Sequence, residues 1–336
     1  MAKTILGVDI GYDNLKLALV SGGRVKKTAS LPMPKNLMKD GHVTSGESMG
    51  EFIRGALKEN GLRARDAAFV LPNETVFVKN VTLPQMTAEQ LEYNLPFEFR
   101  DYITDEIRNY VFDYAMLTDV GDTVPTEEVD STPGMELLAV GVARETVESA
   151  REVMRKAGLR LAKAAPAICA YISLIRSLQA SGGGAADEYC IIDLGYQAIR
   201  MYMFRGERHM VTRVLEIGLS SLDDVIAEAY SVDVHLAHTY LMTNYESCQQ
   251  QEMCLNAYGN IAVELMRALN FYRFSNPDSQ LADVWLCGGG AVIEPLRDAI
   301  VETLGMQLHL PEELVPGGSD IKDCYTFVQA IGIAMD

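Results

Sequence analysis

Residues 8–20 read VDIGYDNLKLALV, and residues 192–204 read IDLGYQAIRMYMF. The two stretches align without a gap: each has Asp, Gly and Tyr at the same positions and continues through a cation into a second apolar strand. The pattern predicts a β-hairpin in each copy, with a tight turn at Gly11 and at Gly195, where glycine allows a positive φ at little cost. The offset of 184 residues, from Asp9 to Asp193, is too long for a solenoid repeat and predicts two related domains in one chain.

The composition indicates a globular protein. The chain has 336 residues, of which 48% are hydrophobic and 22% charged, enough for two or three domains. Its 46 acidic and 29 basic side chains give a net charge of −17, which argues against a nucleic-acid-binding surface. No apolar run reaches the roughly 18 residues of a membrane-spanning helix, and Asp9 comes too early for a signal peptide. Six cysteines lie far apart and indicate free thiols in a reducing compartment, so we expect a cytoplasmic protein without direct membrane insertion.

Helical and strand-like segments follow one another along the rest of the chain. Capping patterns predict helices that begin at Thr87 and Ser220. Further helices are predicted over about residues 47–60, 145–157, 258–272, 292–304 and 325–334. Alternating or continuous apolar runs predict strands over residues 67–71, 75–83, 136–143 and 284–287. Residues 119–134 are acidic and rich in Gly, Pro, Ser and Thr, which predicts a mobile loop. Residues 181–186 (SGGGAA) are predicted to be an interdomain linker.

The two Asp-x-Gly turns have the chemistry of a phosphate site. Backbone N–H groups of such a turn point at one spot and form a concavity that suits phosphate oxygens. Asp9 and Asp193 end their strands and can hold the water shell of a Mg²⁺ ion, while Lys16 on the returning strand can neutralise a phosphate. The alternative is two ordinary glycine hairpins, but a matched pair at equivalent positions favours phosphate binding.

A late run of three glycines is the next candidate. Gly288, Gly289 and Gly290 lie between a buried-strand pattern and a helix, where the bare backbone can approach a base or a ribose closely. A packing turn is the alternative. The chain contains neither a Gly-x-Gly-x-x-Gly fingerprint nor a P-loop. His235 and His238 share a helix face and could bind a metal, although no third ligand is apparent.

The order of these features resembles the two phosphate motifs and the adenosine motif of the actin-like ATPase superfamily. Within it, nearly the whole chain resembles the PilM family, the cytoplasmic actin-like component of type IV pilus assembly. The resemblance rests on residues 6–11 (LGVDIG) with Lys16, 83–87 (LPQMT), 112–114 (FDY), 137–140 (LLAV), 157–159 (AGL), 264–272 (ELMRALNFY) and 286–291 (LCGGGA).

The resemblance implies an α/β fold: the actin-like two-lobed fold of duplicated ribonuclease H-like domains. Residues 1–61 and 143–181 would form the first lobe, residues 62–142 a small α/β insertion in it, and residues 187–336 the second lobe. ATP would lie between the lobes, with Mg²⁺ held through water by Asp9 and Asp193. The implied nucleotide-binding residues are Asp9, Gly11, Tyr12, Asp13, Asn14, Lys16, Asp193, Gly195, Tyr196, Gln197, Gly218, Glu264, Arg267, Gly288, Gly289 and Gly290, and no catalytic residue is assigned.

The resemblance also implies a partner. A PilM-like protein would be an adaptor of a type IV pilus, or of a related secretion system, that docks the cytoplasmic tail of an inner-membrane protein resembling PilN. An extended tail with a few apolar anchors would bind in a groove that uses the insertion. The protein would then lie at the inner face of the cytoplasmic membrane through that partner, and further pilus assembly proteins are additional candidates.

Both turns depart from the family's usual sequence. Tyr12 and Asp13 replace small hydroxyl residues, and the Asp13 carboxylate would repel phosphates unless it faces away or helps to hold the cation. Residues 196–199 (YQAI) replace a Ser/Thr run, although Gln197 and Asn14 can still donate. Residues 164–167 (AAPA) lack the acid that would orient an attacking water. We therefore expect ATP hydrolysis to be slow or absent.

Three other functions remain open. A small-molecule kinase of the same superfamily would use Asp13 as its catalytic acid. A second alternative is a filament-forming protein related to the division protein FtsA. An amphipathic, membrane-targeting C-terminal helix would favour this function, but residues 331–336 (IGIAMD) carry no basic tail. A degenerate scaffold would retain the fold and no longer bind nucleotide. The adaptor explains the most features of the sequence.

Overall fold

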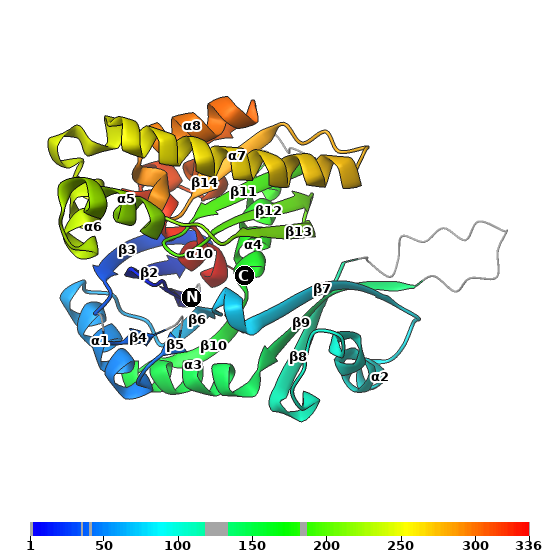
Figure 1. Cartoon of the computed structure of the whole chain (residues 1–336). Coiled ribbons are helices and arrows are strands. Elements are labelled where there is room, and N and C mark those ends of the chain that lie inside the picture. The colour runs from blue at the N-terminus through cyan, green and yellow to red at the C-terminus, as the bar shows by residue number, and fades with distance from the viewer. Residues whose placement is uncertain (1–2, 35, 40–41, 118–133, 182–186, 336) are drawn as a thin grey trace. The chain divides into compact units, whose positions relative to one another are not determined.

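The computed structural model describes residues 3–34, 36–39, 42–117, 134–181 and 187–335. The chain is a mixed α/β protein with two compact units, which are Met1–Met33 with Ile168–Asp336 (unit 1) and Pro34–Ala167 (unit 2). Figure 1 shows their helices and strands. The predicted mobile loop falls almost entirely on residues 118–133, and the predicted linker on residues 182–186, both outside the described residues. The predicted boundaries of the lobes and of the insertion stay predictions.

Both predicted hairpins are present in unit 1, and each extends to a third antiparallel strand. The first copy consists of β1 (Thr4–Ile10), β2 (Asn14–Ser21) and β3 (Arg24–Pro32). The second consists of β11 (Glu188–Leu194), β12 (Ile199–Arg205) and β13 (Arg208–Leu215). Asp9 pairs with Lys16 in the first register and Asp193 with Arg200 in the second, so the repeat is structural as well as sequential.

The turn glycines are needed for space and not for an unusual φ. Neither Gly11 nor Gly195 has a positive φ, so the expectation of left-handed backbone at these positions is wrong. A Cβ atom at Gly11 would lie 3.0 Å from the Asn14 carbonyl oxygen, and one at Gly195 would lie 2.5 Å from the Ala198 carbonyl oxygen. The tight return of each strand therefore leaves little room for a side chain at Gly11 and none at Gly195.

The second copy is part of a five-stranded sheet with the order β13-β12-β11-β14-β15. β14 (Asp283–Cys287) and β15 (Gln307–His309) run parallel to β11. A single apolar core joins these strands to helices α5 to α8, and Figure 1 shows α7 and α8 side by side in unit 1. The helices are α5 (Ser220–Tyr230), α6 (Val234–Thr243), α7 (Glu252–Ser275) and α8 (Glu294–Leu304), with the short α9 (Pro311–Leu314) after them.

The last helix, α10 (Cys324–Ala334), touches its neighbours backbone to backbone. It packs on β1 and β2, and a Cβ atom at Gly7 of β1 would lie only 1.7 Å from the Ala330 carbonyl oxygen. On α4 (Ala167–Ala180), the Ala170 carbonyl oxygen would lie 2.3 Å from a Cβ atom at Gly332. These contacts fix α10 firmly against the first hairpin.

Unit 2 contains a parallel strand pair and a pair of packed helices. β6 (Asp66–Val70) runs parallel to β10 (Arg160–Ala165), and α1 (Gly46–Glu59) packs on α3 (Arg144–Ala157). The short strands β4 (Met38–Lys39) and β5 (His42–Val43) precede α1. The predicted helices over residues 47–60 and 145–157 are confirmed.

A second sheet in unit 2 has a small core of its own. β9 (Met135–Ala143) pairs antiparallel with both β7 (Val76–Leu83) and β8 (Tyr110–Met116), the last of which the sequence pattern did not predict. The helix α2 (Ala88–Asn94) begins with the predicted capping box at Thr87. The core consists of Val81, Leu91, Leu95, Phe99, Ile103, Leu137 and Ala139.

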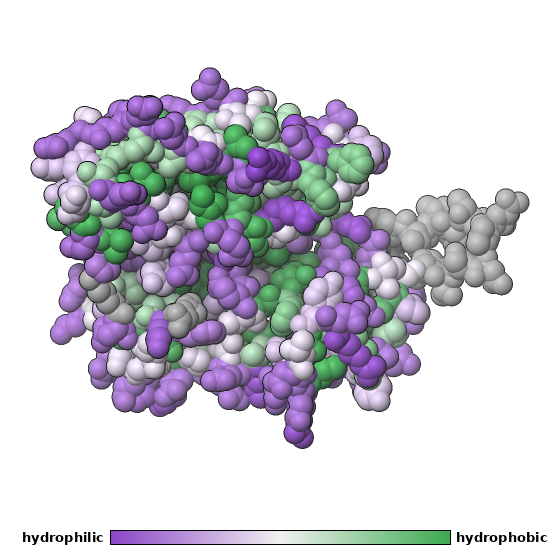
Figure 2. Space-filling model, viewed as in Figure 1, coloured by the Kyte–Doolittle hydropathy of each residue, from purple (hydrophilic) through white to green (hydrophobic). Residues whose placement is uncertain are grey.

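The face of the molecule that Figure 2 shows is mainly polar. Figure 2 shows hydrophilic residues over much of the visible face, with smaller groups of apolar residues among them. Within the described residues, none of the helices combines the length and the hydropathy that a bilayer crossing requires.

Replacing Gly332 by Ala should destabilise the protein, because the new Cβ would lie 2.3 Å from the Ala170 carbonyl oxygen and α10 would have to move. Overpacking of this kind costs about 1–3 kcal/mol. Gly259→Ala in α7 is the matched control, since no atom lies within 4 Å of the added Cβ and a helical Ala stabilises by up to about 1 kcal/mol. Denaturant unfolding measures both, and a Gly332→Ala variant as stable as wild type would contradict this packing.

Candidate functional site

Three charged side chains come together where the two hairpins turn. The Lys16 Nζ atom donates to Asp9 Oδ2 at 3.1 Å, and the two side chains are only 17% and 11% exposed. Burial alone would lower the pKa of Lys16, but the charges of Asp9 and Asp193 outweigh it and raise that pKa above its ordinary value. Lys16 is therefore an ammonium ion that interacts with the carboxylates of both copies.

Both carboxylate oxygens of Asp193 contact other residues. Oδ2 accepts a hydrogen bond of 2.8 Å from Gln329 Nε2 on α10, which also donates to the Tyr171 hydroxyl at 3.0 Å. Oδ1 lies against Gly288, whose φ is 89° and where a Cβ would sit 2.4 Å from that oxygen. Burial raises the pKa of Asp193, since Lys16 and Arg200 offset the loss of hydration only in part.

The donor set fits a hydrated divalent cation. Asp9 and Asp193 supply two carboxylates, and the charges of Lys16 and Arg200 offset the burial of Asp193 only in part. Mg²⁺ typically binds one or two carboxylates and completes its shell with water and phosphate oxygens. Among the residues that the structure describes, no group of three or more His, Cys, Asp or Glu is placed to hold a metal directly. A cation here would therefore need water or phosphate as further ligands.

The tips of the two turns touch through equivalent tyrosines. The rings of Tyr12 and Tyr196 stack with their centroids 5.3 Å apart and their planes 7° from parallel. Tyr12 remains 45% exposed, whereas burial and the nearby charge of Asp223 raise the pKa of Tyr196. The two predicted turns thus pack directly on one another.

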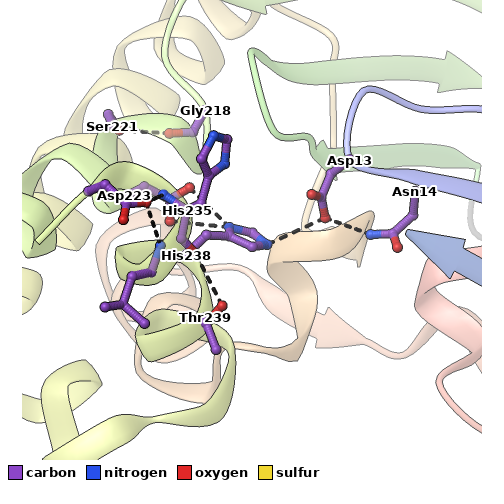
Figure 3. Close-up of polar contacts among 10 residues, drawn as sticks. Asp13, Asn14, Gly218, Ser221, Asp223, His235, His238 and Thr239 are labelled. Atoms are coloured by element: carbon purple, nitrogen blue, oxygen red, sulfur yellow. Dashed lines mark hydrogen bonds and ion pairs between the residues drawn. The ribbon is translucent and has the colours of Figure 1, made fainter. Parts of the chain in front are cut away.

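A histidine on α6 connects the first turn to α5. His238 Nδ1 lies 3.0 Å from Asp223 Oδ2, and His238 Nε2 lies 3.4 Å from Asp13 Oδ2 (Figure 3). The hydrogen bonds with Asp13 and Asp223 outweigh burial and raise the pKa of His238 to about 10. The ring is therefore an imidazolium at neutral pH, paired with two carboxylates instead of sharing a metal ion with His235.

The backbone at Gly218 packs against the second turn. A Cβ atom at Gly218 would lie 2.3 Å from the Tyr196 carbonyl oxygen, so the two backbones are in direct contact. Leu219 N–H donates to the Gly195 carbonyl at 3.1 Å, and Ser220 N–H donates to the Tyr196 carbonyl at 2.9 Å. The start of α5 thereby fixes the conformation of the turn.

The other predicted site residues have varied surroundings. Gly290 packs against Leu194, whereas a Cβ at Gly289 would meet no atom within 4 Å, which leaves that backbone accessible. Glu264 and Arg267 form an ion pair with each other on the exposed surface of α7. The contacts thus bring the two turns and Gly288 together, and the nucleotide-binding roles of all these residues stay predictions.

The sequence pattern did not predict four contributions to this region, which come from Tyr171, Asp223, His238 as a partner of Asp13, and Gln329. The sequence could have indicated Gln329, because it is a polar residue inside the otherwise apolar run from Phe327 to Ala334. Nothing in the sequence indicated Asp223, since it follows Ser220 at a spacing typical of a helix start, and only the structure shows it to be fully buried.

The architecture and the paired Asp-x-Gly turns define a protein of the actin-like ATPase fold. Residues 7–314 match the family model described as type IV pilus assembly protein PilM. The chain belongs to this PilM family.

Solved structures agree with this assignment. The PilM–PilN type IV pilus biogenesis complex matches with a TM-score of 0.81 and 25% identity, over 98% of this chain and 97% of that chain. The ethanolamine utilization protein EutJ from Carboxydothermus hydrogenoformans matches with a TM-score of 0.61 and 15% identity, over 100% and 89%. The activator of the 2-hydroxyisocaproyl-CoA dehydratase from Clostridium difficile, solved with bound ADPNP, has a TM-score of 0.50 and 10% identity over 100% and 93%. The last two show the fold alone, and no curated protein matches the chain.

Replacing Asp193 by Asn should stabilise the protein at neutral pH. The folded-state pKa of Asp193 is above the ordinary 3.8, so its ionisation opposes folding once the pH rises past 3.8, until the folded-state pKa is exceeded. The melting temperature of Asp193→Asn relative to wild type should therefore increase across that window and then level off.

Glu188→Gln is the matched control for that measurement. Glu188 is also buried, but it accepts hydrogen bonds from Arg205, Ser279 and the backbone of Gln280. Its neutral substitute should lower stability at the same pH, because charged hydrogen bonds are lost. An Asp193→Asn variant less stable than wild type at pH 7 would contradict the raised pKa of Asp193.

Proposed function

We propose that this protein is an ATP-binding adaptor of type IV pilus assembly that docks the cytoplasmic tail of a PilN-like inner-membrane protein. The observation that carries the proposal is the PilM family match over residues 7–314, together with the likeness to the PilM–PilN complex over 98% of the chain. Through this partner, the adaptor would lie in the cytoplasm at the inner face of the membrane.

The cluster at the two turns is the proposed nucleotide site. Asp9 and Asp193 would hold Mg²⁺ through water, and Lys16 would neutralise a phosphate. The bound Mg²⁺ would supply positive charge to the phosphates and to the desolvated Asp193. The accessible backbone at Gly289, beside the close contact of Gly288 with Asp193, would face the nucleoside. ATP can change the affinity for the tail only if it binds two conformations of the protein with different affinity.

Hydrolysis is expected to be slow. Residues 164–167, at the end of β10 and the start of α4, carry only apolar side chains and offer no acid for orienting water. The kinase alternative requires Asp13 as a catalytic acid, but its carboxylate lies close to His238 Nε2 and also accepts from Asn14. Turnover of an added small-molecule acceptor would nevertheless favour that alternative.

An aromatic cluster on unit 2 is the proposed docking site for the tail. Tyr93 on α2 and Phe97 just after it meet edge to face at 5.7 Å, and the Arg100 guanidinium lies 4.2 Å from the Phe97 ring. Tyr93 and Phe97 are 73% and 39% exposed, although their rings contact each other. Aromatic and Arg side chains are enriched at binding hot spots, and an apolar tail residue would cover these rings.

Mg²⁺·ATP should bind wild-type protein saturably in a calorimetric titration, and Asp193→Asn should weaken binding at least about tenfold because it removes half of the carboxylate pair. Asp224→Asn is the control, since Asp224 is exposed on α5 next to the buried Asp223. No heat with wild type, accompanied by no thermal shift, would contradict nucleotide binding and favour a static scaffold.

A fluorescent peptide of the PilN-like tail should bind wild-type protein, with Tyr93→Ala and Phe97→Ala each weakening binding about tenfold or more. Phe274→Ala is the matched control, because Phe274 is 85% exposed on α7 in unit 1. Anisotropy titrations with and without Mg²⁺·ATP measure both docking and its response to nucleotide. Equal affinities for the Tyr93→Ala, Phe97→Ala and Phe274→Ala variants would exclude the aromatic cluster as the docking site.

A further inference from the structure

One carboxylate oxygen of Asp13 contacts two donor side chains. Its Oδ2 atom lies 2.6 Å from Asn14 Nδ2 and 3.4 Å from His238 Nε2, so an amide and an imidazole both face one carboxylate oxygen (Figure 3). The Asp13 side chain is 39% exposed and His238 is 21% exposed, which leaves the arrangement open to solvent. An amide and an imidazolium that face one oxygen form an anion site, and phosphate oxygens accept from the same kinds of donor.

The imidazole is positioned independently of Asp13. Both oxygens of Asp223, which is fully buried on α5, lie within 3.2 Å of His238 Nδ1. At the start of α6, Asp233 accepts from the backbone N–H groups of His235 and Leu236 and so anchors the helix that carries His238. A carboxylate that accepts a hydrogen bond from one ring nitrogen fixes the orientation of the ring. The other nitrogen can then donate to a second anion.

The place of this pair in the fold points to phosphate. Asn14 begins β2 directly after the first Asp-x-Gly turn, and the His238 ring lies 5.5 Å from the ring of Tyr196 at the tip of the second turn. The pair therefore borders both turns of the proposed nucleotide site. The backbone of the first turn is fixed without the Asp13 side chain, because Gly11 N–H donates to the Asn14 carbonyl and Met33 N–H donates to the Asp13 carbonyl. The carboxylate can leave by rotation alone.

We propose that His238 and Asn14 bind a phosphate group of the nucleotide, and that the Asp13 carboxylate is an internal competitor that the phosphate displaces. This inference rests on the proposed nucleotide-binding function. It explains why an acid is tolerated beside a phosphate site: with His238 between Asp13 and Asp223, the acid pairs with a cation when no ligand is bound. Exchange of one anion for another keeps the imidazolium paired in both states.

Asp13→Asn tests the competition directly. It keeps the size of the side chain and removes its charge, so Mg²⁺·ATP should bind about tenfold more tightly than to wild type. His238→Gln removes the cation and should weaken binding about tenfold. In the double variant, the gain from Asp13→Asn should disappear, because its cause is the release of His238.

His235→Gln, an exposed histidine on the same helix, is the matched control and should bind as wild type does. Calorimetric titration of the full chain with Mg²⁺·ATP gives the affinities, and thermal unfolding checks that each variant is folded. If His238→Gln does not fold, the His238 imidazole NMR signals decide: they should change when Mg²⁺·ATP is added to wild type, and unchanged signals would overturn the inference. Unchanged affinity in Asp13→Asn, or an equal gain in the double variant, would overturn the inference while leaving nucleotide binding intact. Absence of binding in every variant, wild type included, would overturn both.

Discussion

The position of the Lys16 ammonium, close to the carboxylates of Asp9 and Asp193, is the interaction on which the rest of the site depends. It places one positive charge beside two acids that come from the two copies of the repeat, in a region with little access to water. Burial raises the pKa of Asp193, because the charges of Lys16 and Arg200 offset the lost hydration only in part. The buried Asp193 carboxylate lowers the stability of the folded protein at the position where a divalent cation would bind. Such destabilising groups are common at functional sites.

The duplication explains why equivalent residues of the two turns meet. Sequence differences between the two copies explain why the turns have different contacts. Equivalent residues, Tyr12 and Tyr196, stack on each other at the tips of the turns. The residues that follow them are not equivalent: Asp13 faces His238 on α6, while the backbone around Gln197 rests on Gly218 at the start of α5. The second turn is therefore fixed by backbone contacts, and the first has a side chain that can change partner.

The sequence was sufficient for the features that depend on local pattern. The two hairpins, the capping box at Thr87 and the family resemblance all follow from residues that are close in the chain. The sequence was insufficient where distant segments meet. Gln329 reaches Asp193 across 136 residues, and a buried Asp223 is indistinguishable in the sequence from a helix-capping acid. The sequence located the turn glycines correctly, but the expected reason, a positive φ, was wrong. The carbonyl oxygens of Asn14 and Ala198 approach these glycines, and that approach depends on how each strand returns.

A crystal structure of the protein with Mg²⁺ and a non-hydrolysable ATP analogue tests the central claim most directly. The account predicts that the phosphates lie against the two Asp-x-Gly turns, with a hydrated Mg²⁺ between them and the carboxylates of Asp9 and Asp193. It also predicts that the Asp13 side chain has left His238 Nε2 and that a phosphate oxygen has taken its place. A nucleotide bound elsewhere on the chain, or bound at the turns with the contact between Asp13 and His238 unchanged, would contradict it.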